Sequence, residues 1–147
     1  MFPSVLLFAG FLPCIFAYGT LQRVAVRGRI LCGNQSAADV QMKLYDKDIG
    51  FDDLLDEQRS NASGHFLLDG WTREFTDIEP LLKIYHDCDD TLWCQRRLSL
   101  YIPKKYINRG ERSDFEYDYS RMKVLDVGII NLEAYIWGED RDCFHKK

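Results

Sequence analysis

The stretch that most constrains the fold of this chain runs from Leu81 to Pro103. Two apolar runs rich in β-branched and aromatic residues flank an acidic spacer, and Cys88 and Cys94 stand at the two ends of that spacer. Runs of this composition on both sides of a turn are typical of a β-hairpin. We therefore predict a hairpin here, tied across its turn by a disulfide, at the centre of a small β-sandwich.

The segments Gln22–Cys32 and Val40–Tyr45 alternate between apolar and polar residues. A period of two with one apolar side predicts a half-buried strand. Because Gly33-Asn34 marks a turn after the first segment, we expect the two segments to pair as an antiparallel hairpin. The residues expected to point inward are Val24, Val26, Gly28, Ile30, Cys32, Val40, Met42 and Leu44.

The rest of the chain predicts further short strands and no long amphipathic helix. His65–Trp71 and Val124–Trp137 are expected strands, and Lys104–Arg121 is expected to be a long surface connection. The acidic run Asp46–Glu57 is expected to be a solvated loop with a short helical turn at Asp53–Glu57. Together these segments predict an all-β, antiparallel two-sheet sandwich of about six to eight strands.

The first 19 residues carry no charged side chain and are almost wholly apolar from Val5 to Phe16. This length suits the apolar region of a signal peptide and is short of the roughly 18 to 20 residues that a spanning helix needs. We expect cleavage after Gly19, with Ala17 as the alternative position; an uncleaved anchor is the competing interpretation. Thr20–Lys147 is then one domain of a secreted, extracellular protein that does not span a membrane.

Four cysteines remain after the predicted cleavage, an even number that suits two disulfides in an oxidising compartment. They allow three pairings. The predicted hairpin is compatible with a bond between Cys88 and Cys94, which leaves Cys32 at the end of the first strand to pair with Cys143 after the last.

Charge and motifs exclude several functions. A formal net charge of −4 argues against nucleic-acid binding, which depends on Lys and Arg neutralising phosphates. The sequence contains no Gly-x-Ser-x-Gly, no phosphate loop and no His-Glu-x-x-His. His86 and Cys88 lie close in the chain, but disulfide formation competes with zinc or thiol chemistry in an exported protein. We expect no catalysis, no cofactor and no metal.

Two local patterns predict surface chemistry. A calcium loop over Asp46–Glu57 is a weak alternative, because glycine stands at the fifth instead of the sixth place and Gly50 supplies no side-chain oxygen. Two Asn-x-Ser triplets, at Asn34 and Asn61, fall in expected turns and predict N-linked glycans.

A basic and aromatic stretch within Lys104–Arg121 is the first candidate for binding. Such a mixture suits a contact surface. The alternative is a solvated loop whose aromatic rings lie back on the sandwich. The candidate residues are Lys104, Lys105, Tyr106, Arg109, Arg112, Phe115, Tyr117 and Tyr119.

Six motifs in order resemble the transthyretin-like family of secreted nematode proteins. They span nearly all of the chain after Gly19, from Val-x-Val-x-Gly-x-x-x-Cys-Gly to Ile-Pro-Lys-x-Tyr-Ile. Their positions are Val24–Gly33, Val40–Asp48, Asp52–Asp56, Ser63–Phe66, Ile78–Cys88 and Ile102–Ile107.

The resemblance implies a prealbumin-like sandwich of the transthyretin type. In that fold the first strand and a late strand are parallel neighbours, so that their carboxyl ends meet. The resemblance therefore favours the pairing of Cys32 with Cys143.

For function, the resemblance implies several expectations. Transthyretin carries thyroid hormone between subunits, which makes an oligomeric carrier of a small apolar ligand one hypothesis. Its relative, hydroxyisourate hydrolase, uses histidines and a Tyr-Arg-Gly-Ser that this sequence lacks, so a ureide hydrolase is a weaker one. Asp52–Asp56 and Cys94–Arg96 are similar to a branch that bridges phosphatidylserine on dying cells to an engulfment receptor. We expect a non-enzymatic binding protein of that kind.

Overall fold

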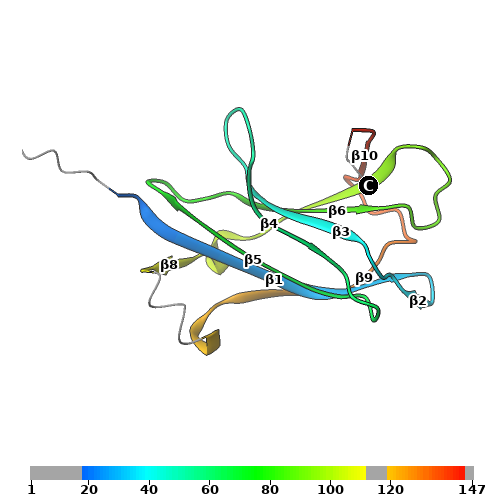
Figure 1. Cartoon of the computed structure of the whole chain (residues 1–147), viewed down its shortest axis with the longest axis horizontal. Helices are drawn as coiled ribbons and strands as arrows, with labels where there is room; N and C mark the ends of the chain where they lie inside the picture. The colour runs from blue at the N-terminus through cyan, green and yellow to red at the C-terminus, as the bar shows by residue number, and fades with distance from the viewer. Residues whose placement is uncertain (1–17, 112–118, 145–147) are drawn as a thin grey trace, which may run out of the picture.

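The computed structural model of this chain describes residues 18–111 and 119–144. In these residues the chain forms a two-layer sandwich of two sheets, and no α-helix is present among them (Figure 1). The strands are β1 (Thr20–Cys32), β2 (Gln35–Ser36), β3 (Gln41–Asp46), β4 (Asp53–Arg59), β5 (His65–Glu74), β6 (Pro80–His86), β7 (Gln95–Tyr101), β8 (Asn108–Gly110), β9 (Val124–Asn131) and β10 (Asp140–Asp142). The all-β prediction is confirmed.

Strand β1 lies at the centre of the first sheet. It pairs antiparallel with β5 along one side, and on the other side it pairs with β8 and, in parallel, with β9. The parallel neighbour expected from the family resemblance is therefore present. Val24, Val26 and Ile30 of β1 are fully buried and face the second sheet, as the period of two predicts.

The second sheet has the strand order β10-β7-β6-β3-β4. Its centre is the predicted hairpin, in which Leu82 lies opposite Leu100 and Ile84 opposite Leu98. The apolar faces of the two sheets form one core. Burial of apolar area at about 25 cal/mol per Å² is the main term that stabilises such a sandwich.

The expected hairpin between Gln22–Cys32 and Val40–Tyr45 is wrong. β1 turns at Gly33 into the two-residue strand β2, and the chain then crosses to the second sheet, where β3 pairs with β4 and β6. The buried Ala37 marks this crossing, and its N–H donates to the Ile30 carbonyl at 3.0 Å. Both segments have one apolar side because they face each other across the core, which alternation alone cannot distinguish from pairing within a sheet.

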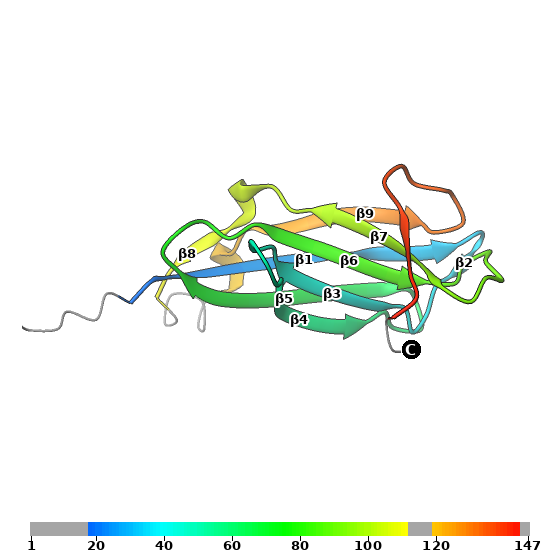
Figure 2. The same cartoon turned by 90° about the horizontal axis from the view of Figure 1, so that it is seen from above.

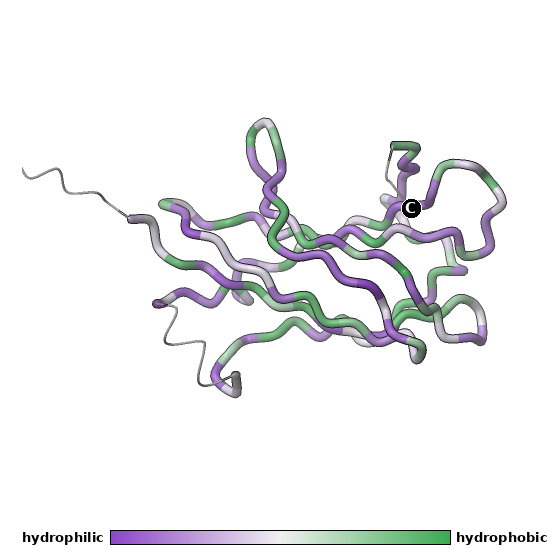
Figure 3. Tube along the Cα trace, viewed as in Figure 1, coloured by the Kyte–Doolittle hydropathy of each residue, from purple (hydrophilic) through white to green (hydrophobic). Residues whose placement is uncertain are grey.

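The expected helical turn at Asp53–Glu57 is also wrong, because these residues begin strand β4. β4 pairs antiparallel with β3 at the edge of the second sheet. Its two apolar residues, Leu54 and Leu55, are adjacent and so lie on opposite faces, and its other residues are polar, so no period of two marked it as a strand. The preceding loop, residues 47–52, projects away from the sandwich (Figure 3), and its Ile49 and Phe51 are exposed.

The predicted cysteine pairing is wrong, although all four cysteines do form disulfides. Cys32 bonds to Cys88 and Cys94 bonds to Cys143. The first bond joins the ends of β1 and β6 and so links the two sheets. The second continues the β7–β10 ladder, in which Asp142 lies opposite Gln95, because the chain crosses to the second sheet after β9.

The sequence expectations for the last third of the chain are met in part. Lys104–Arg121 contains two short 3-10 helices, η1 (Lys104–Tyr106) and η2 (Tyr119–Arg121), and strand β8. The expected strand Val124–Trp137 ends at Asn131, and the short strand β10 was not predicted.

The sandwich has two distinct ends (Figure 2). One end, here called the disulfide end, gathers the turn after β1, the β6–β7 loop and the β9–β10 loop. The other, here called the opposite end, gathers the start of β1, the β3–β4 and β5–β6 loops and η1.

Candidate functional site

A groove of about 580 Å³ lies on the outer face of the first sheet. It is formed where β1, β5 and β9 run side by side, and its lining combines cationic and apolar side chains. The pairing of β1 with β9 shifts register between Arg27 and Arg29, and Gly28 lies there against Val127 and Gly128. Residues from the three strands line it: Arg27, Gly28, Arg29, His65, Phe66, Leu67, Asp126, Gly128 and Ile129.

The two arginines of the groove are held but not buried. Arg27 Nε donates to Asp126 at 3.0 Å, and both side chains of this pair are more than half exposed. Arg29 donates to the Ser63 carbonyl and to Ser36 Oγ, each at 3.0 Å. A hydrogen bond from the Gly128 N–H, followed by that from Arg27, lowers the pKa of Asp126.

Apolar side chains lie on the same face as these guanidinium groups. Leu67 is 47% exposed and Ile129 is 64% exposed. Exposed apolar surface next to fixed cationic donors is suited to a ligand that has an anionic group joined to an apolar part.

Sequence reasoning missed the groove, although it placed Arg27 and Arg29 on the outward side of β1. The signal that could have found it was the row of outward arginines at Arg23, Arg27 and Arg29. Of these, Arg23 pairs with Asp69 of β5 at 2.6 Å and lies outside the groove lining.

The predicted basic and aromatic stretch lies at the opposite end. Lys104 and Lys105 are exposed on η1, and Tyr106 is half-buried against the core. Arg109, in β8, pairs with Asp77 at 2.6 Å. Arg112, Phe115 and Tyr117 lie outside the described residues, and Tyr119 begins η2.

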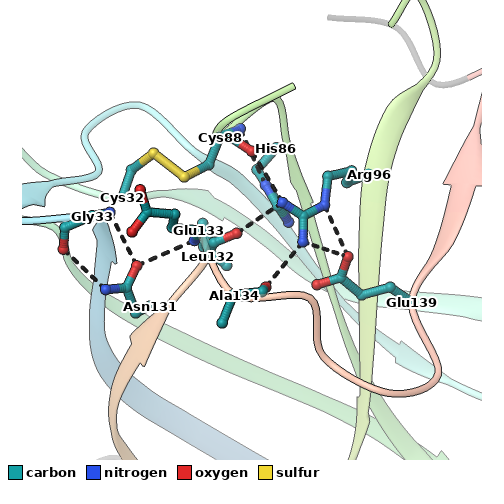
Figure 4. Close-up of a disulfide and its surroundings, with 10 residues drawn as sticks. All are labelled: Cys32, Gly33, His86, Cys88, Arg96, Asn131, Leu132, Glu133, Ala134 and Glu139. Carbon is teal, nitrogen blue, oxygen red and sulfur yellow. Dashed lines mark hydrogen bonds and ion pairs between the residues drawn. A yellow bond between two sulfur atoms is a disulfide. The ribbon is translucent and has the colours of Figure 1, made fainter. Parts of the chain in front are cut away.

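The disulfide end contains a buried charged cluster around Arg96 (Figure 4). Arg96 is 7% exposed, and its guanidinium donates to three backbone carbonyls at 3.0 Å each, those of Cys88, Leu132 and Ala134. It also pairs with Glu139 at 2.8 Å, whose side chain is 1% exposed. This cluster fixes the β9–β10 loop against β7.

His86 packs beside Arg96 (Figure 4) and is itself buried. Its Nδ1 accepts the Cys88 N–H at 3.2 Å, and its Nε2 has no hydrogen-bond partner among the described residues. Burial, and next the charge of Arg96, lower the pKa of His86. The ring is closed off from solvent, so it is not placed to act on a substrate.

In the acidic stretch Asp46–Glu57, which was the candidate calcium loop, the carboxylates of Asp46 and Asp52 contact different partners. Asp46 accepts the Glu79 N–H at 2.7 Å, and burial raises its pKa. Asp52 pairs with Lys83 at 3.0 Å. Within residues 18–111 and 119–144 there is no group of three or more His, Cys, Asp or Glu side chains that could hold a metal ion.

Both predicted glycan acceptors are exposed in turns. Asn34 lies in the turn between β1 and β2. Asn61 begins the turn before β5, where its Oδ1 accepts the N–H groups of Ser63 and His65, which leaves the glycan-bearing Nδ2 out of these two bonds. The described part of the chain contains no helix that is long and apolar enough to cross a membrane.

Comparison with known proteins gives a consistent result. The model of the transthyretin-like family matches residues 27–103. Transthyretin-like protein 33 of Caenorhabditis elegans is 41% identical over 85% of this chain and 84% of its own length. Transthyretin-like protein 5 of the same organism is 39% identical over 86% of this chain and 88% of its own length. Among solved structures, a 9R-lipoxygenase from Cyanothece aligns with 77% of this chain and 17% of its own at 17% sequence identity. The TM-score is 0.40, which is too low to indicate a shared fold.

Proposed function

Because this chain belongs to the transthyretin-like family, we propose that it is an extracellular, non-enzymatic binding protein that recognises an anionic phospholipid head group. The first candidate is phosphatidylserine on the surface of dying cells, which the protein bridges to an engulfment receptor. The observation that carries the proposal is the groove of the first sheet, where Arg27 and Arg29 stand beside exposed Leu67 and Ile129.

The donor chemistry of the groove supports a phosphate ligand. A guanidinium has five N–H donors in a fork that matches the oxygens of a phosphate or carboxylate. The bonds described above use one donor of Arg27 and two of Arg29, so both side chains keep N–H groups for a ligand. The exposed Leu67 and Ile129 supply apolar surface for the glycerol and upper acyl region.

Export is part of the proposal and has independent support. Two disulfides are typical of an oxidising compartment. Strand β1 begins at Thr20, the first residue after the expected cleavage position, so removal of residues 1–19 leaves every described strand intact.

The test is binding of the purified, oxidised protein to vesicles of graded phosphatidylserine content, at two salt concentrations and with and without calcium. We expect saturable binding that weakens with salt, because the contact is electrostatic. The double variant Arg27→Gln/Arg29→Gln is expected to bind at least tenfold more weakly. The matched control is Lys104→Gln/Lys105→Gln, which removes two exposed cations at the opposite end.

Each outcome has a defined meaning. Equal binding by the arginine variant and the wild type contradicts the groove assignment. Loss of binding only in the lysine variant moves the lipid contact to the stretch that the sequence favoured. Competition by soluble glycerophosphoserine separates recognition of the head group from attraction to a charged surface.

A second candidate function is carriage of a small apolar or amphiphilic ligand between subunits. Leu67, Trp71 and Ile129 are each about half exposed or more, and two copies facing each other through this sheet cover them. Light scattering is the check: a stable dimer or tetramer supports a carrier, and a monomer contradicts it.

A ureide hydrolase is a third and weaker candidate. It requires a histidine and a basic residue in one pocket, and His65 does line the groove with Arg27 and Arg29. We expect no turnover of ureide substrates, because the sequence lacks the Tyr-Arg-Gly-Ser motif of those enzymes.

A further inference from the structure

The geometry points to the disulfide end as a docking surface for a basic segment of a partner protein. Its contact residues are four exposed aromatic side chains, called here the aromatic platform: Trp93, Tyr135, Trp137 and Phe144. This inference deepens the receptor-binding half of the proposed function and rests on it for the partner being a protein.

The first observation is the exposure of these rings. Trp93 is 81% exposed, Trp137 is 95% exposed and Phe144 is 96% exposed, and Tyr135 is 75% exposed. They come from the β6–β7 loop, the β9–β10 loop and the segment after β10. None of them contributes to the buried core, and Trp and Tyr are the residues that most often dominate the free energy of protein binding.

The second observation is that the loops carrying these rings are held rigidly. The Cys94–Cys143 disulfide has Trp93 and Phe144 as its chain neighbours. Arg96 fixes the loop that carries Tyr135 and Trp137 through two of its carbonyls and Glu139, and it also bonds to the Cys88 carbonyl of the β6–β7 loop. A surface that is already ordered loses less conformational entropy when it binds a partner.

Two further ion pairs tie the same loops together. Arg141 of β10 pairs with Asp90 of the β6–β7 loop at 2.7 Å, and Arg141 lowers the pKa of Asp90 through this bond. Arg97 of β7 pairs with Asp142 of β10 at 2.7 Å. The arginines at this end are thus occupied by carboxylates of the same end.

The third observation is the sign of the charge. Residues 87–97 and 132–144 contain seven carboxylates and three arginines, an excess of four negative charges, and Lys146 and Lys147, which follow outside the described residues, leave an excess of two. Asp89 and Glu133 are exposed. The negative potential of these carboxylates favours a basic partner. The Lys or Arg side chains of such a partner can lie over the faces of the exposed Trp rings.

The same charge argues against an anionic lipid surface as the occupant. It also separates the two surfaces: the groove carries guanidinium groups and the aromatic platform carries an excess of carboxylates. The protein can therefore hold an anionic ligand on the first sheet and a basic protein segment at its end.

The test uses two synthetic decapeptides, an Arg-Gly repeat and a Glu-Gly repeat, titrated against the full-length oxidised protein by calorimetry at low and high salt. We expect saturable binding of the Arg-Gly peptide, weakened by salt, and none of the Glu-Gly peptide. The double variant Trp93→Ser/Trp137→Ser is expected to bind at least tenfold more weakly. Ile49→Ser/Phe51→Ser, which removes two equally exposed apolar residues at the opposite end, is the matched control and is expected to bind normally.

Several results overturn the inference. They are absence of saturable Arg-Gly binding up to millimolar peptide, equal binding by the tryptophan variant, and equal weakening in the control variant. Self-association that the tryptophan variant abolishes identifies a second copy as the occupant, and binding to zwitterionic vesicles that it abolishes identifies a lipid surface. The Arg27→Gln/Arg29→Gln variant is expected to keep peptide binding, so failure of the lipid test and failure of this one are distinguishable.

Discussion

The two ends of the sandwich are stabilised by different chemistry. At the disulfide end, two covalent bonds and the buried Arg96–Glu139 pair hold the loops. At the opposite end, single side chains without a buried ion pair do so. Gln22 donates to the Thr76 carbonyl at 2.6 Å and accepts the Ile78 N–H at 3.1 Å, and the buried Asp46 accepts the Glu79 N–H. The first arrangement fixes long loops firmly but depends on complete charge pairing, whereas the second loses stability in small steps when a bond is lost.

Asn108 is a second neutral side chain at the opposite end that hydrogen-bonds to several segments at once. Its amide donates to the carbonyls of Arg23, Tyr106 and Lys123, and its Oδ1 accepts the Lys123 N–H at 2.8 Å. These bonds join β8 to β1 and to the segment before β9 without any buried charge.

The largest expected effect is that of Arg96→Met. Removal of the guanidinium leaves the Glu139 carboxylate, 1% exposed, buried without its partner, and breaking such a pair costs about 3–5 kcal/mol. Urea unfolding measures the loss. The control is Arg109→Met at the opposite end, whose partner Asp77 is exposed, with an expected loss of less than about 1 kcal/mol. Equal losses in the two variants contradict the contrast between the ends.

A smaller effect is expected for Asn108→Ala. The variant removes the buried Asn108 amide and leaves the part-buried Lys123 N–H and carbonyl without their side-chain partner, at a cost of about 2 kcal/mol. Asn34→Ala, in an exposed turn, is the matched control and is expected to change the free energy of unfolding by less than about 0.5 kcal/mol. If Asn108→Ala lowers the free energy of unfolding as much as Arg96→Met does, the two ends do not differ in the way described.

The smallest effect is the pH dependence that His86 gives the disulfide end. The pKa of folded His86 lies below its ordinary value of 6.5, so the unfolded state takes up the proton first as pH falls through 6.5. Stability is then lost on acidification, by at most about 1.4 kcal/mol per pH unit for one proton. Unfolding curves between pH 7 and about pH 5 measure this slope, which His86→Leu is expected to flatten; an unchanged slope assigns it to other groups.

The difference between the ends also explains what sequence could predict. The central strands were predictable because each has one apolar face, as Met42 and Leu44 show in β3. The edge strands β4 and β10 were not, because polar residues occupy both faces. Only part of the groove could be predicted from the sequence. The outward arginines of β1 were evident, but β5 and β9 complete the groove, and no local sequence pattern shows that these strands pair with β1.

The predicted cysteine pairing was wrong for a related reason. A short spacer between Cys88 and Cys94 favours a local bond, but both cysteines bond instead to residues brought near by the tertiary fold. The outcome depended on the chain crossing between sheets after Gly33 and again after Asn131, and neither crossing has a sequence signal of its own.

The parallel pairing of β1 with β9 has a consequence for the order of events during synthesis. Ala25 lies opposite Val124, so the central strand of the first sheet remains open along one edge until the last third of the chain has been synthesised. Such late contacts slow folding and leave an unpaired edge exposed in the meantime. A ribosome-bound chain that stops before β9 is therefore expected to hold a formed β6–β7 hairpin and an unfinished first sheet. The protein then most needs a chaperone in the period before β9 has been synthesised.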